Sequence, residues 1–208
     1  MSELGSHTDP VLAADTVDPA WIELIRATRP TVGAVRLVCV DGPAGAGKTS
    51  ITAALAQALE PTFGVVPVVH GDELYEGWDV VAGVADRVTA FGMLADRLET
   101  WLLEPWRRDS EGAHPLWDWR SGAWSGSRRV PAAPVVLLDG VALASGTLRD
   151  QAVLSVWVGA DDSVRLDRVL ARDGESLRIE MLTWQRDESI WHDLDDTRAG
   201  VDARVWTT

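Results

Sequence analysis

The chain has 208 residues, a length that fits one domain with a small lid better than it fits two domains. Hydrophobic residues make up 46% and charged residues 25% of it, which excludes disorder as the overall description. The formal net charge of −13 would repel both phosphate backbones and anionic lipids. Nucleic acid and membrane surfaces are therefore excluded as expected partners.

The ends and the cysteine content indicate a cytoplasmic protein. Residues 1–17 are acidic and contain Gly, Ser and Pro, without the basic start and apolar stretch of a signal peptide. We expect them to form a flexible tail before a single domain at residues 18–208. The single cysteine, Cys39, cannot form an internal disulfide, so nothing points to an oxidising compartment.

The predicted elements alternate between helices and short apolar strands. We expect helices at residues 18–30, 50–59 and 161–172, and two more within residues 78–106 that break near residues 91 and 92. We expect strands at residues 35–40, 65–69, 135–138, 153–158 and 203–206. Residues 107–134, rich in Trp, Arg, Gly and Pro, are interpreted as an irregular excursion. This order predicts an α/β fold with a five-stranded, parallel, doubly wound sheet and helices on both faces.

A complete phosphate-loop motif follows the first predicted strand. Residues 42–49 match G-x-x-x-x-G-K-[ST] between a predicted strand and a predicted helix, the context that the motif requires. Glycines let backbone N–H groups surround a phosphate, and Lys48 reaches its oxygens. Lys48 is the only lysine among 19 basic residues. The residues expected to bind ATP are Gly42, Pro43, Ala44, Gly45, Ala46, Gly47, Lys48, Thr49 and Ser50.

A magnesium site is expected from two further oxygen ligands. The Thr49 hydroxyl is the usual Mg²⁺ ligand of this motif, and Asp139 ends the apolar run 135–138 in the manner of a Walker B strand. A buried strand that ends in an ordinary turn aspartate is the alternative for Asp139. The motif at residues 42–49 favours the metal site.

A candidate general base follows the second predicted strand. Asp72 lies where the carboxyl ends of parallel strands place ligands, and a carboxylate there could accept the proton of an attacking hydroxyl. Glu73 is the competing acid, and a helix-capping role is the alternative for Asp72. His70 is interpreted as a residue of the strand end.

A row of arginines marks a candidate lid at about residues 165–180. Arg165, Arg168 and Arg172 share one face of a predicted helix, because they are spaced three and four residues apart. Such a row could close over a triphosphate and stabilise the charge of the transferred group. The alternative is a solvated helix face.

Three residues of the excursion suggest an acceptor site. Trp117 and Trp119 flank Asp118, so two rings could stack on a base or sugar beside a hydrogen-bond acceptor. Plain packing is the alternative for these two of the eleven tryptophans.

Together these segments resemble the uridine kinase-like group of P-loop kinases, in particular its small actinobacterial-type members, over residues 35–206. The resemblance implies that Asp72 is the catalytic base, that Tyr75, Trp117 and Trp119 bind a nucleoside, and that Arg168 and Arg172 act from the lid. Asp79 is the nearest counterpart of the ribose-binding carboxylate. The sequence departs from the family at Asp139-Gly140, where Glu-Gly is usual.

The function expected from the sequence is transfer of the γ-phosphoryl group of ATP to a hydroxyl of a small molecule, with Mg²⁺. A pyrimidine nucleoside, uridine or cytidine, is the leading acceptor, and the chain could form a homo-oligomer. A nucleoside monophosphate is the second candidate acceptor, because residues 41–48 also resemble cytidylate kinases. Its clamps would be Arg107, Arg108, Arg128 and Arg129. A nucleotide-binding switch protein is the third reading.

Overall fold

The computed structural model describes residues 17–208, so the predicted tail lies outside the described residues except for Val17. One parallel sheet of five strands forms its centre, in the order β2-β5-β1-β6-β7. The strands are β1 (Arg36–Asp41), β2 (Val68–His70), β5 (Val135–Gly140), β6 (Ala152–Gly159) and β7 (Ala203–Trp206). The α/β prediction is confirmed, although the second strand begins at Val68 and leaves Val65 81% exposed.

Both faces of the sheet are covered, which explains why its strands are continuous apolar runs. Alternate residues of β1 belong to different cores: Leu37 and Cys39 to one, Val38 and Val40 to the other. The sheet is therefore doubly wound, as predicted.

One face of the sheet packs against α1 (Pro19–Ala27) and α2 (Lys48–Phe63). Asp18 caps α1 by accepting a hydrogen bond from the N–H of Ala20 at 2.9 Å. The second helix was expected to end before Pro61, but it continues to Phe63 with the proline inside. Pro61 lies in the last turn, where the loss of one N–H donor costs little of the helix.

The other face is covered by a string of short helical segments and by the long helix α8 (Arg178–Asp195). The segments are α3 (Arg87–Gly92), α4 (Leu94–Leu98), the π-helical turn η3 (Glu99–Leu103) and α5 (Glu104–Arg107). The break falls next to the predicted position. The helix expected from residue 78 begins only at Arg87. Residues 78 and 79 belong instead to the 3₁₀ turn η2 (Gly77–Asp79), which comes after the 3₁₀ turn η1 (Gly71–Glu73).

The interpretation of residues 107–134 as irregular was wrong. They contain an antiparallel hairpin of β3 (Gly112–Asp118) and β4 (Ala123–Val130), in which Trp117 pairs with Trp124. Most of β4 is exposed, and its small and basic residues lack the apolar alternation that marks a half-buried strand. The backbone ladder forms the hairpin without that pattern.

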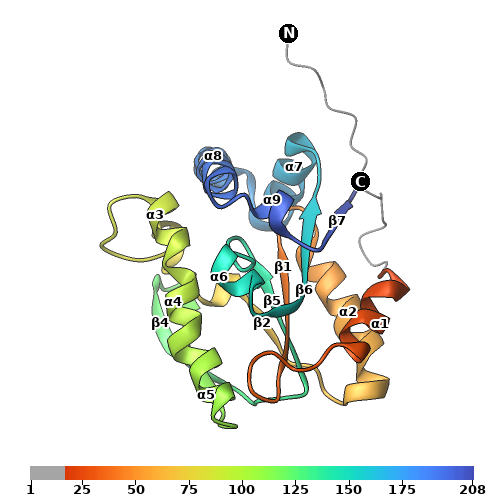
Figure 1. Ribbon diagram of the computed structural model, residues 1–208. Coiled ribbons are helices and arrows are strands. Elements are labelled where there is room, and N and C mark those ends of the chain that lie inside the picture. Colours follow the sequence, from red (N-terminus) through yellow and green to blue (C-terminus); the bar gives the residue numbers. More distant parts are fainter. Residues whose placement is uncertain (1–16) are drawn as a thin grey trace.

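The C-terminal third of the chain adds several further helical segments. They are α6 (Gly146–Arg149), α7 (Asp162–Asp173), the turn η4 (Glu175–Leu177) and α9 (Thr197–Gly200). Figure 1 shows α7 and α8 together beyond the carboxyl end of β6, whereas α9 lies beside that strand. Among the described residues, none of the helices has the length and apolar character that a membrane crossing needs.

Candidate active site

The phosphate loop has a backbone that only glycine adopts easily. Gly42, Gly45 and Gly47 have φ values of 142°, 78° and 95°. A Cβ at Gly42 would lie 2.0 Å from the carbonyl oxygen of Val158, and one at Gly45 would lie 2.4 Å from that of Arg165. The backbones of β6 and α7 thus pack closely against the outer side of the loop and leave no room there for a side chain.

The loop leads into a helix start that suits an anion. Gly47 is the N-cap of α2, and no side chain caps the helix there, so its first N–H groups and its dipole are available to a phosphate. Lys48 Nζ donates to the carbonyl oxygens of Gly42 at 2.7 Å and Pro43 at 3.0 Å. Thr49 and Ser50 are exposed beside it. These groups fit the phosphates of ATP.

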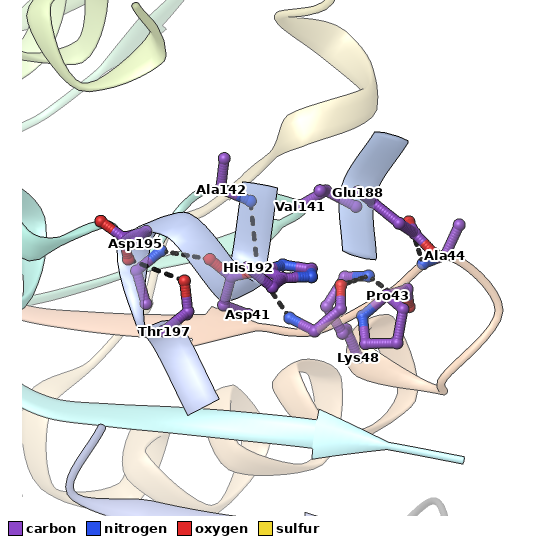
Figure 2. A network of polar contacts seen from close by, with 12 residues as sticks. Asp41, Pro43, Ala44, Lys48, Val141, Ala142, Glu188, His192, Asp195 and Thr197 are labelled. Carbon is purple, nitrogen blue, oxygen red and sulfur yellow. Dashed lines mark hydrogen bonds and ion pairs between the residues drawn. The ribbon is translucent and has the colours of Figure 1, made fainter. Parts of the chain in front are cut away.

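A buried aspartate anchors the base of the loop (Figure 2). Asp41, the last residue of β1, accepts hydrogen bonds from the N–H of Gly42 at 2.6 Å and of Ala144 at 2.7 Å. His192 Nε2 of α8 lies 3.2 Å from the same carboxylate. Asp41 therefore joins the phosphate loop to the segment after β5 and to the last turns of α8. The sequence analysis gave Asp41 no role, although it directly precedes the motif.

Asp139 has one carboxylate oxygen free for a metal. The side chain is buried, and one oxygen lies 2.6 Å from His70 Nδ1 across the pair β2–β5. The other oxygen is buried and, within the described residues, has no hydrogen-bond partner. An unsatisfied buried carboxylate oxygen is costly unless a cation or water uses it. Mg²⁺, bound directly or through water, fits this atom together with the exposed Thr49 hydroxyl.

Asp72 keeps part of its surface open to solvent, although protein atoms surround and desolvate its carboxylate. Burial by the surrounding protein raises the pKa of its carboxyl above the ordinary value, while Lys48 and Arg172 oppose that rise. Asp139 adds to the rise by charge repulsion. The charges of Lys48, Arg172 and Asp139, which come from three other segments, therefore all act on Asp72.

The competing acid, Glu73, is already engaged. Both of its oxygens lie 3.0 Å from Arg128 Nη1, and His114 Nε2 lies 3.7 Å away. These contacts tie η1 to the hairpin β3–β4. Asp72, rather than Glu73, is thus the carboxylate that remains open to an incoming hydroxyl.

The hairpin places tryptophan rings beside the candidate base. Trp119 Nε1 donates to the carbonyl oxygen of Asp72 at 2.8 Å, and its ring is 41% exposed. Trp78 packs edge-on against Trp119 with ring centroids 5.4 Å apart. Trp117 packs in the same way against Trp124 at 5.2 Å.

Two residues expected at the acceptor site, Tyr75 and Asp118, have their polar groups engaged by neighbouring residues, while the role expected of Asp79 stays a prediction. Tyr75 is 1% exposed, and its hydroxyl both donates to and accepts from the backbone of Val141 at 2.8 Å, so it packs in the core instead of lining an open site. Asp118 accepts from Ser121 Oγ at 2.7 Å and turns into its own loop. Asp79 is exposed in η2.

The three lid arginines divide into two groups. Arg165 is buried, ion-paired with Glu188 at 2.7 Å, and donates to the carbonyl oxygen of Ala44. Arg168 donates to the carbonyl oxygen of Gly45 at 3.2 Å and to the last two residues of the chain. Both arginines therefore support the phosphate loop by donating to its carbonyl oxygens. The lid role predicted for Arg168 would have required it to cover the loop instead. Arg172 is mostly exposed, pairs with Asp173 and acts on Asp72.

The four arginines considered for an acceptor phosphate do not converge. Each of them pairs with a different acidic side chain, so their charges are neutralised at separate places. The pairs are Arg107 with Glu99, Arg108 with Glu104, Arg128 with Glu73, and Arg129 with Glu111.

Comparison with known proteins tests the fold. A possible uridine kinase from Bacillus stearothermophilus superimposes with a TM-score of 0.61 and 18% identity, over 89% of this chain and 95% of that one. A protein named as a candidate fructose transport system kinase from a Silicibacter species gives 0.60 and 16%, over 90% and 97%. D-Glycerate 3-kinase from Cryptococcus neoformans gives 0.54 and 15%, over 90% and 92%. The chain has the fold of the P-loop kinases.

The resemblance to uridine kinase-like proteins is thereby confirmed at the level of the fold. No family model matches the chain, and none of the curated proteins matches it. The roles of individual site residues consequently depend on the geometry described above.

Besides Asp41, the sequence analysis missed a second residue of this site. Glu188 of α8 is buried and accepts a hydrogen bond from the N–H of Ala44 at 2.9 Å (Figure 2). Its position four residues after Trp184 is the only signal the sequence offers, because residues so spaced share a helix face. Nothing in the sequence relates that face to the phosphate loop.

Proposed function

We propose that this protein is an ATP-dependent kinase that transfers the γ-phosphoryl group to a hydroxyl of an uncharged small molecule with a flat ring, a pyrimidine nucleoside being the leading candidate. The observation that carries the proposal is the placement of Asp72. Asp72 closely follows His70, which contacts Asp139 across the pair β2–β5, and the charges of Lys48 and Asp139 both act on its carboxylate. A phosphoryl-transfer site needs a base, a phosphate cation and a metal ligand in this proximity.

The roles follow from the contacts. The N–H groups at the start of α2 and Lys48 hold the phosphates, which requires Lys48 to leave the carbonyl oxygens of Gly42 and Pro43. Thr49 and the free oxygen of Asp139 would hold Mg²⁺, which neutralises charge on the transferring phosphoryl group. Asp72 accepts the proton of the acceptor hydroxyl as the oxygen attacks the γ-phosphorus.

His70 positions the metal-binding carboxylate. Its Nδ1 lies 2.6 Å from one oxygen of Asp139, which fixes the orientation of the carboxylate and leaves the other oxygen for the ion. Loss of a group that orients a ligand in this way typically costs about 10- to 100-fold in metal affinity.

The polar groups around Asp72 favour a neutral acceptor. Arg128 is neutralised by Glu73, and an ionised phosphate close to Asp72 would be repelled. The exposed ring of Trp119 and the neighbouring Trp78 offer apolar surface to a base or sugar. These contacts disfavour a nucleoside monophosphate.

Arg172 is the candidate for transition-state stabilisation. It is the only one of the three lid arginines that does not donate to the phosphate loop or to Glu188, and its charge already acts on Asp72. An exposed guanidinium whose ion pair is with the adjacent Asp173 can turn toward the transferring group.

The test is ADP formation by the purified chain with MgATP and a panel of nucleosides, nucleoside monophosphates and sugars. We expect the fastest turnover with uridine or cytidine. Faster turnover with CMP or UMP would show that the acceptor is a nucleoside monophosphate instead of a nucleoside. Slow hydrolysis that no acceptor stimulates would favour a nucleotide-binding switch protein.

A further inference from the structure

Two helices, α7 and α8, contact the outer side of the phosphate loop at Ala44. Both peptide groups of Ala44 are engaged: Glu188 accepts from its N–H at 2.9 Å, and Arg165 donates to its carbonyl oxygen at 3.1 Å. Glu188 and Arg165 are themselves joined by a buried ion pair of 2.7 Å. If the loop shifts, α7 and α8 must therefore shift with it or lose a buried contact to a charged group. Losing such a contact is costly.

Within α8, Glu188 also contacts a tryptophan. The carboxylate oxygen of Glu188 that accepts from Ala44 also accepts from Trp184 Nε1, at 2.9 Å. Trp184 is 4% exposed, and its ring contacts the ring of Trp78 edge-on at 5.8 Å. Arg87 reinforces this step, because its guanidinium lies over the Trp184 ring and donates to the Trp78 carbonyl oxygen at 2.6 Å.

The last step reaches the candidate base. Trp78 packs against Trp119, whose Nε1 donates to the carbonyl oxygen of Asp72. Packed rings and direct hydrogen bonds thus connect Ala44 with Asp72 without a gap. None of these intermediate contacts is required to bind a phosphate or to accept a proton.

We propose that Glu188 and Trp184 are positioning residues that couple occupation of the phosphate loop to the placement of the hairpin and of Asp72. The inference deepens the proposed function and rests on it, because it joins the nucleotide site to the acceptor site. A bound phosphate supplies the driving force. It attracts Lys48 away from the carbonyl oxygen of Pro43, and that carbonyl belongs to the same peptide group as the Ala44 N–H that donates to Glu188.

The test is hydrogen–deuterium exchange of the full chain with and without MgADP, which needs no acceptor. In the wild type we expect MgADP to slow exchange both in residues 42–51 and in the hairpin, residues 112–130, the latter by about fivefold or more. In Trp184→Phe, which removes the Nε1 donor, residues 42–51 should stay protected while the protection of the hairpin by MgADP is lost.

Trp191→Phe is the matched control. Trp191 belongs to the same helix, and within the described residues its Nε1 has no hydrogen-bond partner. We expect this variant to keep the response of the hairpin. Because each variant is compared with itself, with and without MgADP, a general loss of stability cancels.

Glu188→Gln is the second variant. It removes the buried counter-charge of Arg165, which keeps only its pair with the exposed Asp162, so it is examined only if it folds, whereas Trp184→Phe keeps both ion pairs. Protection of the hairpin by MgADP that survives in Trp184→Phe would overturn the coupling, as would a wild-type hairpin that does not respond. MgADP that protects no part of the wild-type chain would instead overturn the proposed function.

Discussion

At the scale of single residues, the chemistry rests on a few charged groups whose contacts differ from those of their neighbours. Asp72 and Glu73 are adjacent, yet Arg128 engages Glu73 and leaves Asp72 open. Arg168 and Arg172 lie one helical turn apart, yet one donates to the phosphate loop and the other acts on Asp72. The motif at residues 42–49 could be read from the sequence because its spacing is local. The choice between neighbours depends on contacts from distant segments and could not.

Lys48→Ala should abolish phosphoryl transfer while the fold stays intact. The variant removes the cation expected at the β- and γ-phosphates, and the chain has no other lysine to replace it. Turnover in the ADP assay and the circular dichroism spectrum check this together. Near-wild-type turnover would contradict the nucleotide site.

Asp72→Asn should lower kcat by about 10²- to 10⁴-fold, the range for loss of a general base, with little change in ATP affinity. Glu73→Gln is the matched control, and we expect a smaller loss of kcat from it because Glu73 is held by Arg128. A parallel loss of ATP binding in Asp72→Asn would indicate a metal ligand instead. A larger effect of Glu73→Gln would move the base to Glu73.

The pH dependence of kcat should show the raised pKa of Asp72. A general base acts only when deprotonated, so activity is present above its pKa in the folded protein and is lost as the pH falls through it. Because burial raises that pKa above the ordinary value of 3.8, the acid limb should lie higher than an ordinary aspartate would place it. An acid limb below pH 3.8 in a chain that is still folded would contradict the assignment.

At the scale of elements, strands and helices with strong periodicity were predictable, and the hairpin was not. β1 and β5 contain the continuous apolar runs 37–40 and 135–138 because both faces of the sheet are covered, which the sequence shows directly. The hairpin β3–β4 is held by its backbone ladder and by contacts such as that of Trp119 with Asp72. Those contacts join residues that are far apart in the sequence, so no local sequence pattern predicts the hairpin.

Arg172→Ala and Arg168→Ala should separate catalysis from support of the loop. Arg172→Ala is expected to lower kcat by about 10²-fold with an unchanged melting temperature, since it removes a charge that acts on the transition state. Arg168→Ala should lower the melting temperature, because Arg168 bridges Gly45 and the last two residues. Kinetics and thermal unfolding of both variants check the distinction, and equal profiles would refute it.

Trp119→Phe should lower kcat by about fivefold, the value of one hydrogen bond of ~1 kcal/mol, because Asp72 loses the donor that holds its carbonyl oxygen. Trp124→Phe is the control on the same hairpin, since its ring packs against Trp117 and not against η1. Steady-state kinetics with the best acceptor of the panel measures both. Identical losses would assign the effect to the hairpin as a whole.

At the scale of the whole molecule, β1 links stability to ligand binding. Cys39 lies in this central strand, is fully buried, and has its thiol pKa raised by that burial. The same strand ends at Asp41, which anchors the phosphate loop. The sheet and the phosphate loop therefore share one strand.

Alkylation of Cys39 should occur only when the molecule opens globally, and MgADP should slow it, because a ligand of the native state reduces the unfolded population. We expect MgADP to have no such effect on Lys48→Ala. Alkylation rates in mild denaturant measure this. Rapid labelling of the native chain would contradict the burial of β1.

The most direct test of the account is to follow the γ-phosphate itself. Wild type and Asp72→Asn are incubated with MgATP that is radiolabelled at the γ-phosphate and with the best acceptor of the panel, and the products are separated. We predict label on a hydroxyl of a neutral acceptor with the wild type, and about 10²-fold or greater loss with Asp72→Asn. Label found only in free phosphate, or transfer that is equally fast in both proteins, would contradict it.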